Sequence, residues 1–426
     1  MTQRAVHILA ALGVAIIFWT SLTSCRHQRV DAPLRSIERL DGPPLLRVRV
    51  VKRAASCTVR CDSPLRIYEG ARQLAYWTSL PERPVTPTPT GFAVGAEPLS
   101  ADALRFEPEG DALIYVDGTA YRGRMRLDRS VDALTLDAIN LIDLERYLWG
   151  VVACEVRSDW PMPAIRAQAV AARTYAFRQS RRRAGYRFHL SSTDADQVYR
   201  GVSGESRRTV AAVDDTRGAM LIWGSERQPI MAFYSACCGG ATTRASLGLG
   251  EKDIPPLSGT ECPYCDPARH VPGTGTPMKY FRWTQSLQKA WIAAELREAG
   301  FDAQAVRGVS VQETDASGRA VRVAIATDQA QPIVMSGRSF RELAAFDRIR
   351  KSPADRFPGL DDVHRFRSTR FTVRDDGAAV MVEGSGWGHG VGMCQWGAKG
   401  MADNGCNYLQ ILALYYPGAQ VAQLYP

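Results

Sequence analysis

Hydrophobic and polar residues alternate through much of the first third of the chain. Alternating stretches occupy residues 45–79, 112–127 and 133–144, and a period of two is typical of strands that bury one face. The proline-rich stretch PERPVTPTPTG at 81–91 predicts a break, because proline cannot donate a hydrogen bond in a sheet interior. We therefore expect a small β-rich accessory segment over residues 45–109, followed by a larger domain over 110–426.

A different period begins after Trp160. Across residues 164–183 apolar side chains recur at helical spacing, and the many alanines indicate close packing against a neighbour. Ser158 or Asp159 is expected to cap this helix. Further helices are predicted at 284–300 and 408–416, and further strands at 319–327, 370–375 and 378–384. The fold class that follows is α+β, a strand-rich mixed fold with a few helices.

Residues 384–400 read GSGWGHGVGMCQWGAKG, with glycine at every second position from 384 to 392. In an extended strand these glycines would share one bare face, and Trp387 and His389 would project from the other. Such a face suits the close approach of a ligand. The alternative is a sharp corner that needs unusual backbone dihedrals. The spacing excludes a GxGxxG phosphate loop, because His389 stands where the third glycine would be.

The first 24 residues have the pattern of a signal peptide. Arg4 precedes an apolar run from Ala5 to Trp19, and Leu-Thr-Ser-Cys then ends at Cys25. This ending resembles the lipobox of bacterial lipoproteins, whose cysteine is lipidated and becomes the first residue of the mature protein. We expect residues 25–44 to be a tether and the protein to be exported and membrane-anchored through Cys25. A secreted protein with a chance cysteine is the alternative.

The chain is basic, with 53 Lys and Arg against 44 Asp and Glu and a formal net charge of +9. Such a charge suits a polyanion or an anionic membrane surface. The densest basic run lies at the end of the predicted helix and consists of Arg178, Arg181, Arg182, Arg183 and Arg187. In an exported protein it fits a solvated helix end better than a nucleic-acid arm, so no nucleic acid partner is expected.

The cysteines allow either disulfides or a metal site. Export favours disulfides, and Cys57 and Cys61 in CTVRC are a plausible pair. The CPYC stretch at 262–265 has the two-residue spacing of a zinc-binding turn. Cys238, Cys262, Cys265 and His270 could together hold a structural zinc ion, and a pair of disulfides is the alternative.

Glu155 is the main candidate for chemistry. It lies in LERYLWGVVACEVRSDWP, among aromatic and aliphatic residues that would destabilise an ionised carboxylate and raise its pKa. A carboxyl that keeps its proton near neutral pH can act as a general acid. The alternative is a surface glutamate that stabilises a helix N-terminus. Trp387 and Trp396 flank His389 and offer aromatic planes of the kind that stack on sugars. Neither GxSxG nor HExxH is present, which excludes two common hydrolase sites.

Four ordered segments resemble one known family. They are LERYLWGVVACEVRSDWPMPAIRAQAVAARTYAF, STDADQVYRGV, AFYSACCGGATT, and GSGWGHGVGMCQWGAKGMADNGCNYLQILALYYPGA. In that order they are similar to the stage II sporulation protein D family, and the similarity runs from about residue 110 to the C-terminus. The family consists of peptidoglycan lytic transglycosylases and related amidase-enhancer proteins. The resemblance therefore implies that residues 110–426 form a catalytic domain acting on cell-wall glycan.

The resemblance also implies roles for individual residues. Glu155 falls on the proposed catalytic acid of the family. We expect a glycan-binding groove lined or supported by Trp387, His389, Gln395, Asp194, Gln197, Tyr199 and Arg173. The chain departs from the family at Tyr234, where a histidine is usual, and at Cys154 and Cys394, which adjoin the matching motifs and could form a disulfide with each other. Zinc ligation found in some members could therefore use other residues here.

The implied reaction is cleavage between N-acetylmuramic acid and N-acetylglucosamine, which leaves a 1,6-anhydro sugar. It needs one carboxyl group as acid and then base, and no cofactor, so any zinc would be structural. The resemblance also implies a preference for strands freed of stem peptides by an amidase, and a site facing the cell wall. A non-catalytic glycan-binding lipoprotein that recruits or enhances an amidase is the alternative.

Overall fold

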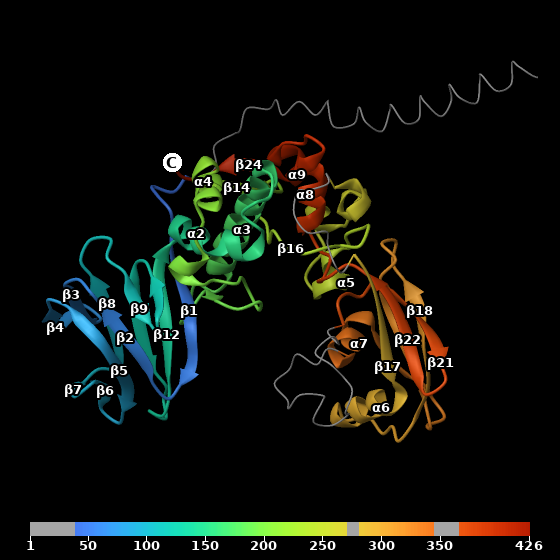
Figure 1. The fold of residues 1–426 in the computed structure, drawn as a ribbon, viewed down its shortest axis with the longest axis horizontal. Helices are drawn as coiled ribbons and strands as arrows, with labels where there is room; N and C mark the ends of the chain where they lie inside the picture. The colour runs from blue at the N-terminus through green and yellow to red at the C-terminus, as the bar shows by residue number, and fades with distance from the viewer. Residues whose placement is uncertain (1–38, 271–280, 345–365) are drawn as a thin grey trace, which may run out of the picture.

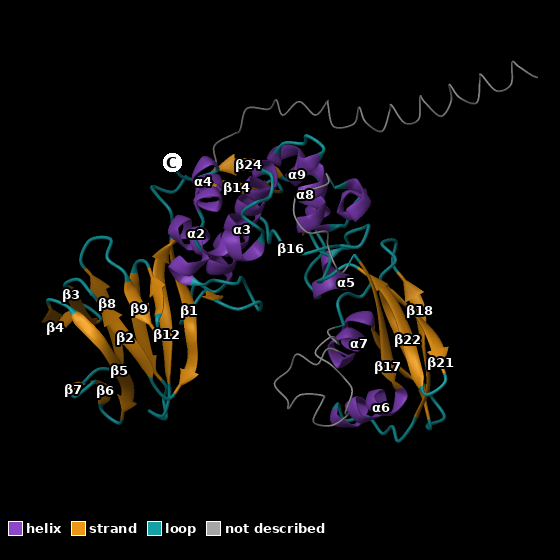
Figure 2. Ribbon diagram, in the orientation of Figure 1, coloured by secondary structure: helices purple, strands orange, loops and turns teal. Residues whose placement is uncertain are grey.

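The computed structural model describes residues 39–270, 281–344 and 366–426 (Figure 1). The predicted signal peptide, Cys25 and most of the predicted tether lie outside these residues. Two strand-rich regions stand on either side of a helical middle, as Figure 2 shows by colour. The predicted α+β class is confirmed, with strands more numerous than helices.

The N-terminal region consists of two sheets around one hydrophobic core. The strand orders are β13-β1-β12-β11-β8-β3-β4 and β10-β9-β2-β5-β6-β7. The strands are β1 (Leu45–Ala54), β2 (Cys57–Cys61), β3 (Leu65–Glu69), β4 (Arg72–Trp77), β5 (Leu80–Thr88), β6 (Gly91–Val94), β7 (Glu97–Leu99), β8 (Ala103–Pro108), β9 (Ile114–Val116), β10 (Thr119–Tyr121), β11 (Arg124–Arg129), β12 (Leu136–Asp143) and β13 (Leu190–Ser191). Alternate residues such as Leu65 and Ile67 are fully buried, as the period of two predicts. The boundary expected at 109/110 falls between β8 and β9, and the two sheets continue to the end of β12.

The predicted break at residues 81–91 is wrong, because most of this stretch forms β5. The strand lies between β2 and β6, but its two neighbours are staggered along it. Pro84 pairs only with β2, whereas Pro87 pairs only with β6. Each of these prolines therefore has one side without a neighbouring strand, where a missing N–H group costs no ladder hydrogen bond.

Helices pack on the N-terminal sheets and connect them to the rest of the chain. They are α2 (Leu144–Glu155), α3 (Met162–Arg182) and α4 (Arg207–Asp215). Helix α3 confirms the predicted helix at 164–183, but its N-cap is Pro161 and no side chain caps it, so the expected caps Ser158 and Asp159 are wrong. Helix α2 was not predicted, although Asp143 caps it by accepting a hydrogen bond from the Arg146 N–H at 3.0 Å.

A second core joins α3 to the C-terminal helices. Its elements are β14 (Ala219–Trp223), β15 (Gln228–Pro229), β16 (Tyr234–Ser235), α5 (Ala245–Leu249), β23 (Met393–Cys394), α8 (Gln395–Asp403), α9 (Tyr408–Tyr415) and β24 (Gln420–Gln423). The predicted helix at 408–416 is confirmed as α9, which begins with a capping box between Asn407 and Gln410. Strands β16 and β23 run parallel to each other although they lie far apart in sequence, with Tyr234 opposite Met393 and Ser235 opposite Cys394.

The remaining strands form a third unit with its own core. In sequence this unit lies between α5 and β23. It contains β17 (Arg282–Gln288), α6 (Lys289–Glu298), β18 (Val306–Thr314), β19 (Ala320–Thr327), β20 (Ile333–Ser336), α7 (Gly337–Ala344), β21 (Phe371–Asp376) and β22 (Ala379–Ser385). The strands predicted at 319–327, 370–375 and 378–384 are confirmed. The helix predicted at 284–300 begins only at Lys289, because the residues before it pair with β22.

Candidate functional site

Glu155 is the last residue of α2. The helix ends there because Val156 adopts an extended conformation and caps it. The carboxyl group therefore lies at the negative end of the helix dipole, where an ionised form is disfavoured. This position contradicts the alternative that Glu155 stabilises a helix N-terminus, since α3 begins seven residues later.

Three segments bring hydrogen-bond donors to the Glu155 carboxyl group. The Val198 N–H donates to Oε1 at 3.3 Å, and the Gln395 amide donates to Oε2 at 3.5 Å. The Tyr234 hydroxyl is the third partner. No ion pair to Glu155 occurs among the described residues. Burial raises the pKa of Glu155 from 4.5 to about 7, even though these hydrogen bonds lower it. A carboxyl with this pKa is in part protonated at neutral pH.

A chain of buried polar groups fixes the direction of the Tyr234 hydroxyl. The Tyr147 hydroxyl donates to the Gln197 side-chain oxygen at 3.2 Å, and the Gln197 amide donates to the Tyr234 oxygen at 2.9 Å. Because its oxygen already accepts from Gln197, Tyr234 has its own proton free to donate to Glu155. Gln197 is 1% exposed. It acts on Glu155 through its hydrogen bond to Tyr234.

The glycine run does not form the predicted extended strand. Strand β22 ends at Ser385, and Gly386, Gly388, Gly390 and Gly392 then all have positive φ, between 70° and 105°. Every second residue of the run is therefore a glycine with left-handed backbone dihedrals, which other residues rarely adopt. The structure thus agrees with the alternative of a sharp corner and not with an extended strand. A side chain at Gly388 would also approach Ser235 Cβ to 2.8 Å, so the chain packs closely against β16 there.

The run holds Trp387 and His389 in different environments. Trp387 is 37% exposed, and the Arg367 guanidinium lies 5.5 Å from its ring centre. His389 uses both ring nitrogens, since Nε2 lies 3.0 Å from the Tyr234 carbonyl oxygen and Nδ1 accepts from the Val391 N–H at 3.0 Å. Burial, with Arg319 and Arg341 nearby, lowers the pKa of His389 to about 3. The neutral imidazole thus holds the backbone of Tyr234, and its hydrogen-bonding atoms are already occupied.

Of the other residues expected in a glycan groove, Asp194, Tyr199 and Arg173 form no hydrogen bond with Glu155 in the described structure. Asp194 is exposed, whereas Tyr199 is buried and donates to Asn140 at 2.9 Å. Arg173 is 0% exposed and pairs with Glu145 at 2.8 Å, so the expectation that Arg173 binds substrate is corrected: it is a structural residue. Gln395 begins α8 and does contact Glu155, although that does not test whether it binds a glycan.

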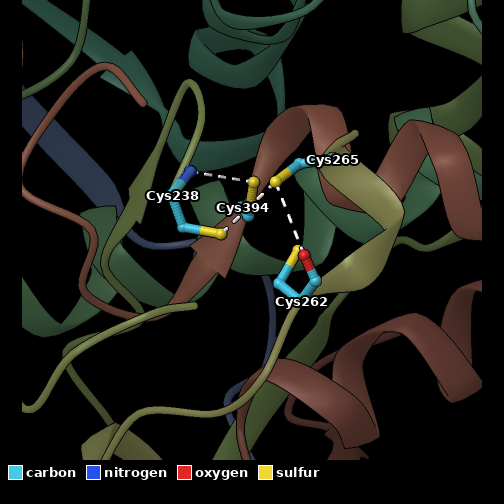
Figure 3. A group of neighbouring side chains, drawn as sticks. All are labelled: Cys238, Cys262, Cys265 and Cys394. Carbon is cyan, nitrogen blue, oxygen red and sulfur yellow. Dashed lines mark hydrogen bonds between the residues drawn. The ribbon is translucent and has the colours of Figure 1, made fainter. Parts of the chain in front are cut away.

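Four cysteines bring their sulfur atoms together beside this site (Figure 3). They are Cys238, Cys262, Cys265 and Cys394, all buried, and their sulfurs lie within 4.8 Å of one another. The predicted fourth member, His270, is instead hydrogen-bonded to Asp403 at 3.2 Å, which is a correction to the expected ligand set. All cysteines of the described residues are free thiols. A Cys57–Cys61 disulfide is excluded, because these residues lie four apart on one extended strand, about 13 Å by strand geometry.

The cysteine cluster lies next to two of the groups that contact Glu155. Cys394 immediately precedes Gln395, and its sulfur accepts from the N–H groups of Cys238 at 3.2 Å and Gly397 at 3.3 Å. Through the pairing of β16 with β23, Cys394 also stands opposite the neighbour of Tyr234. The cluster is therefore continuous with the backbone that positions the Tyr234 hydroxyl and the Gln395 amide.

Sequence reasoning did not assign Tyr234, Val198 or Gln168 to the site. Gln168, fully buried on α3, accepts from Gln395 at 3.4 Å and so orients the amide that reaches Glu155. A signal existed only for Tyr234, which stands where the resembling family usually has histidine. Val198 acts through its backbone N–H, and Gln168 resembles any other residue of a helix. Neither role could therefore be predicted from the residue type.

Comparison with known proteins supports the relationship suggested by the motifs. Residues 133–223 match the family model described as stage II sporulation protein, and this range contains Glu155 and Gln197. The chain is 28% identical over 391 residues to an uncharacterized protein of Brachyspira hyodysenteriae, covering 91% of this chain and 95% of that one.

Two relatives from Bacillus subtilis carry descriptive names. The amidase enhancer is 29% identical over 344 residues, which cover 74% of this chain but only 46% of the relative. Stage II sporulation protein D is 26% identical over 301 residues, which cover 67% of this chain and 76% of the relative. Residues 133–223 thus match the stage II sporulation protein family model, and the chain is similar over two thirds or more of its length to proteins named amidase enhancer and stage II sporulation protein D.

Proposed function

We propose that this protein is a lytic transglycosylase that cleaves the bond between N-acetylmuramic acid and N-acetylglucosamine in cell-wall glycan. The observation that carries the proposal is the half-buried Glu155 carboxyl group, which has no cationic partner among the described residues and is held by donors from three separate segments. Cell-wall processing is what the family relationship supports, and Glu155 supplies the chemistry.

The reaction needs only one carboxyl group. Protonated Glu155 gives its proton to the glycosidic oxygen while the bond from C1 of the muramic acid to that oxygen breaks. The resulting carboxylate takes the proton of the C6 hydroxyl of the same sugar as O6 bonds to C1. The products are a 1,6-anhydro sugar and a strand with a free hydroxyl, and no water is consumed. The elevated pKa of Glu155 suits both steps, because the group must be protonated before cleavage and ionised after it.

Two acidic residues near the site in sequence are engaged elsewhere. Asp196, two residues before Val198, accepts hydrogen bonds from the side chains of Gln179 and Arg183. Asp159 pairs with Arg157 at 2.7 Å on the surface. Hydrolysis with two carboxyl groups would need a second carboxylate near the first. The intramolecular hydroxyl as nucleophile is consistent with a site built around one carboxyl group.

The decisive experiment compares Glu155→Gln with the unchanged protein on purified cell-wall sacculi. We expect release of anhydro-sugar ends to fall at least ~10²-fold, since general acid–base catalysis contributes ~10² to 10⁴ in rate. Glu205→Gln serves as a matched control, because this glutamate pairs with Arg122 away from the site. Unchanged release of anhydro ends by Glu155→Gln would contradict the proposal, as would hydrolytic ends from the unchanged protein.

A second candidate function comes from the relative named amidase enhancer. In this case the protein would bind glycan and stimulate an amidase without cleaving the strand itself. Adding the protein to an amidase digestion separates the two, because stimulation by Glu155→Gln equal to that by the unchanged protein would show an activity independent of the acid. Stimulation without any anhydro product would favour this second function over the first.

We propose further that the substrate strand is denuded of stem peptides and that the protein works in the cell envelope, anchored through Cys25. No helix of the described residues has the length and apolarity needed to cross a membrane. Because the lipid on Cys25 is the proposed anchor, replacing this residue by alanine should move the protein from the membrane fraction to the soluble fraction. Recovery of this variant with the membranes would contradict the anchor.

The four-cysteine cluster is proposed to hold one structural zinc ion. A tetrahedral site with Zn–S bonds of about 2.3 Å places sulfurs about 3.8 Å apart, and the Cys238 and Cys265 sulfurs lie 3.7 Å apart. The N–H groups that point at Cys394 also suit a thiolate. Four thiolates leave no open position, so bound zinc would fasten the segment after β16, the 262–265 turn and β23 together.

Metal analysis of the purified protein tests this proposal without an activity assay. We expect about one zinc per chain, its loss in a Cys262→Ser, Cys265→Ser variant, and a lower unfolding temperature after chelation. Cys57→Ser is the matched control, since this cysteine is buried in the N-terminal sheets. Absence of metal together with disulfides among the four cysteines would contradict it.

A further inference from the structure

Three cavities follow one another along the C-terminal half of α3. The first, about 460 Å³, lies between β1 and residues 186–196, and the second, about 480 Å³, shares Arg183, Tyr186 and Asp196 with it. The third, about 750 Å³, shares Arg182, Met231 and Phe233 with the second. Neighbouring cavities share lining residues, and we call the three together the arginine groove.

The arginine groove is more basic than acidic. Six cationic side chains line it, namely Arg49, Lys52, Arg178, Arg182, Arg183 and Lys252. Three acidic residues line it as well, and two of them are neutralised, Glu251 by Arg182 at 2.8 Å and Asp196 by Arg183 at 2.9 Å. Lys52, Arg178 and Lys252 are exposed and form no ion pair with any residue in the described ranges. These three charges are available to a ligand.

Aromatic side chains accompany the charges. Tyr186 is 68% exposed at the junction of the first two cavities. Phe188 lies under Arg49, whose guanidinium is 4.0 Å from its ring centre, and Trp223 lines the third cavity. One exposed and two half-buried aromatic rings beside unpaired cations favour a ligand that is both cyclic and acidic, since rings stack on sugars and cations attract anions.

The groove also begins beside the candidate active site. Asp196, shared by the first two cavities, lies two residues before Val198, whose N–H contacts Glu155. Phe233, shared by the last two, directly precedes Tyr234, the hydroxyl partner of Glu155. The lining of the groove and two donors of Glu155 therefore lie on the same two chain segments, which is the basis for placing one strand across both.

We infer that the arginine groove binds the part of the glycan strand beyond the cleaved bond and selects strands by the free carboxylates on their muramic acid units. The inference rests on the proposed function, because it concerns the same substrate. An amidase that removes a stem peptide hydrolyses the amide at the lactyl group and leaves one carboxylate on every second sugar. A strand that keeps its peptides has amides at those positions, and its carboxylates lie on the peptides, away from the sugar rings. The groove thus offers a physical reason for a preference for denuded strands.

Binding can be measured separately from cleavage by using the Glu155→Gln protein as background, which leaves the strand intact. The probes are amidase-treated glycan strands and the same strands with their carboxylates converted to methylamides. We expect the carboxylate strands to bind roughly tenfold more tightly, which corresponds to a few exposed ionic contacts. Adding Lys52→Ala, Arg178→Ala and Lys252→Ala should remove this advantage and leave binding of the methylamide strands nearly unchanged.

A second triple variant controls for net charge. Arg83, Arg207 and Arg307 are exposed cations that do not line the groove, and replacing all three by alanine removes the same charge. Equal losses in the two triple variants, or equal binding of carboxylate and methylamide strands, would overturn the inference. Groove-dependent binding of anionic phospholipid vesicles without binding of glycan would overturn it in favour of a membrane surface. Absence of anhydro products from the unchanged protein would instead count against the proposed function alone.

Discussion

Helix α2 carries a glutamate at each end, and the two carboxyl groups are in opposite states. Glu145, in the first turn, is 1% exposed and accepts two hydrogen bonds from Arg173, each at 2.8 Å. It also accepts from the Gly218 N–H and the Tyr425 hydroxyl. Burial alone would raise its pKa, but Arg173 and these donors hold it below the usual value. Glu145 is therefore an ionised structural group.

Glu155, at the other end, has fewer donors, and no cation pairs with it in the part of the chain that the structure describes. Its contacts are longer, at 3.3 and 3.5 Å, and burial raises its pKa to about 7. The helix dipole adds to the contrast, because it favours negative charge at the N-terminus and disfavours it at the C-terminus. The comparison shows that the partners of a carboxyl group, and not burial alone, decide whether it serves as an anchor or as an acid.

The largest effect is expected from a substitution that removes the cation paired with Glu145. Arg173→Met leaves the Glu145 carboxylate buried without a cation, which we expect to lower the free energy of unfolding by about 3–5 kcal/mol. Urea denaturation at pH 7 measures it. The double variant Glu145→Gln, Arg173→Met is the control and should lose less, because it leaves no buried charge. A loss below about 1 kcal/mol for Arg173→Met would show that the pair is not what holds α2 to α3.

Removing the charge of Glu155 should have the opposite effect on stability. The folded protein binds the Glu155 proton more tightly than the unfolded chain, so stability falls as pH rises from about 4.5 to about 7 and is constant above. Glutamine does not titrate. We expect Glu155→Gln to be about 1–2 kcal/mol more stable than the unchanged protein at pH 8, after allowance for partial exposure, and nearly equal to it at pH 4. Denaturation at both pH values measures this, and lower stability of the variant at pH 8 would argue against an elevated pKa.

A smaller effect, on the pKa of Glu155, is expected from a substitution at Tyr234. Tyr234→Phe removes a hydrogen bond that stabilises the ionised form of Glu155, so the pKa of Glu155 should rise further, by roughly half a unit to one unit. The rate of release of anhydro ends should decline as pH rises through about 7 in the unchanged protein, and the midpoint of that decline should move upward in the variant. Tyr199→Phe is the matched control, since this hydroxyl donates to Asn140. An unchanged or lower midpoint for Tyr234→Phe would exclude this hydrogen bond.

Much of the local structure was predictable because its cause is local. The period-two strands of the N-terminal sheets, helix α3 and helix α9 follow from side-chain patterns that set which face is buried. Errors arose where a distant partner decided the outcome. β5 accepts its prolines because β2 and β6 are staggered, and residues 282–288 are a strand because β22 lies beside them. No window of the sequence contains that information.

The candidate site divides in the same way. Its sequence alone determined that Glu155 stands in apolar company, that Cys262 and Cys265 have metal-ligand spacing, and that the glycines of 384–392 have an unusual role. Only the tertiary structure decided that Cys394 and not His270 completes the cysteine cluster, that Arg173 is bound to Glu145, and that Tyr234 and Gln395 meet at Glu155. The reason is physical: residue type and local pattern fix what a side chain can do, whereas pKa and pairing depend on neighbours that folding brings from far along the chain.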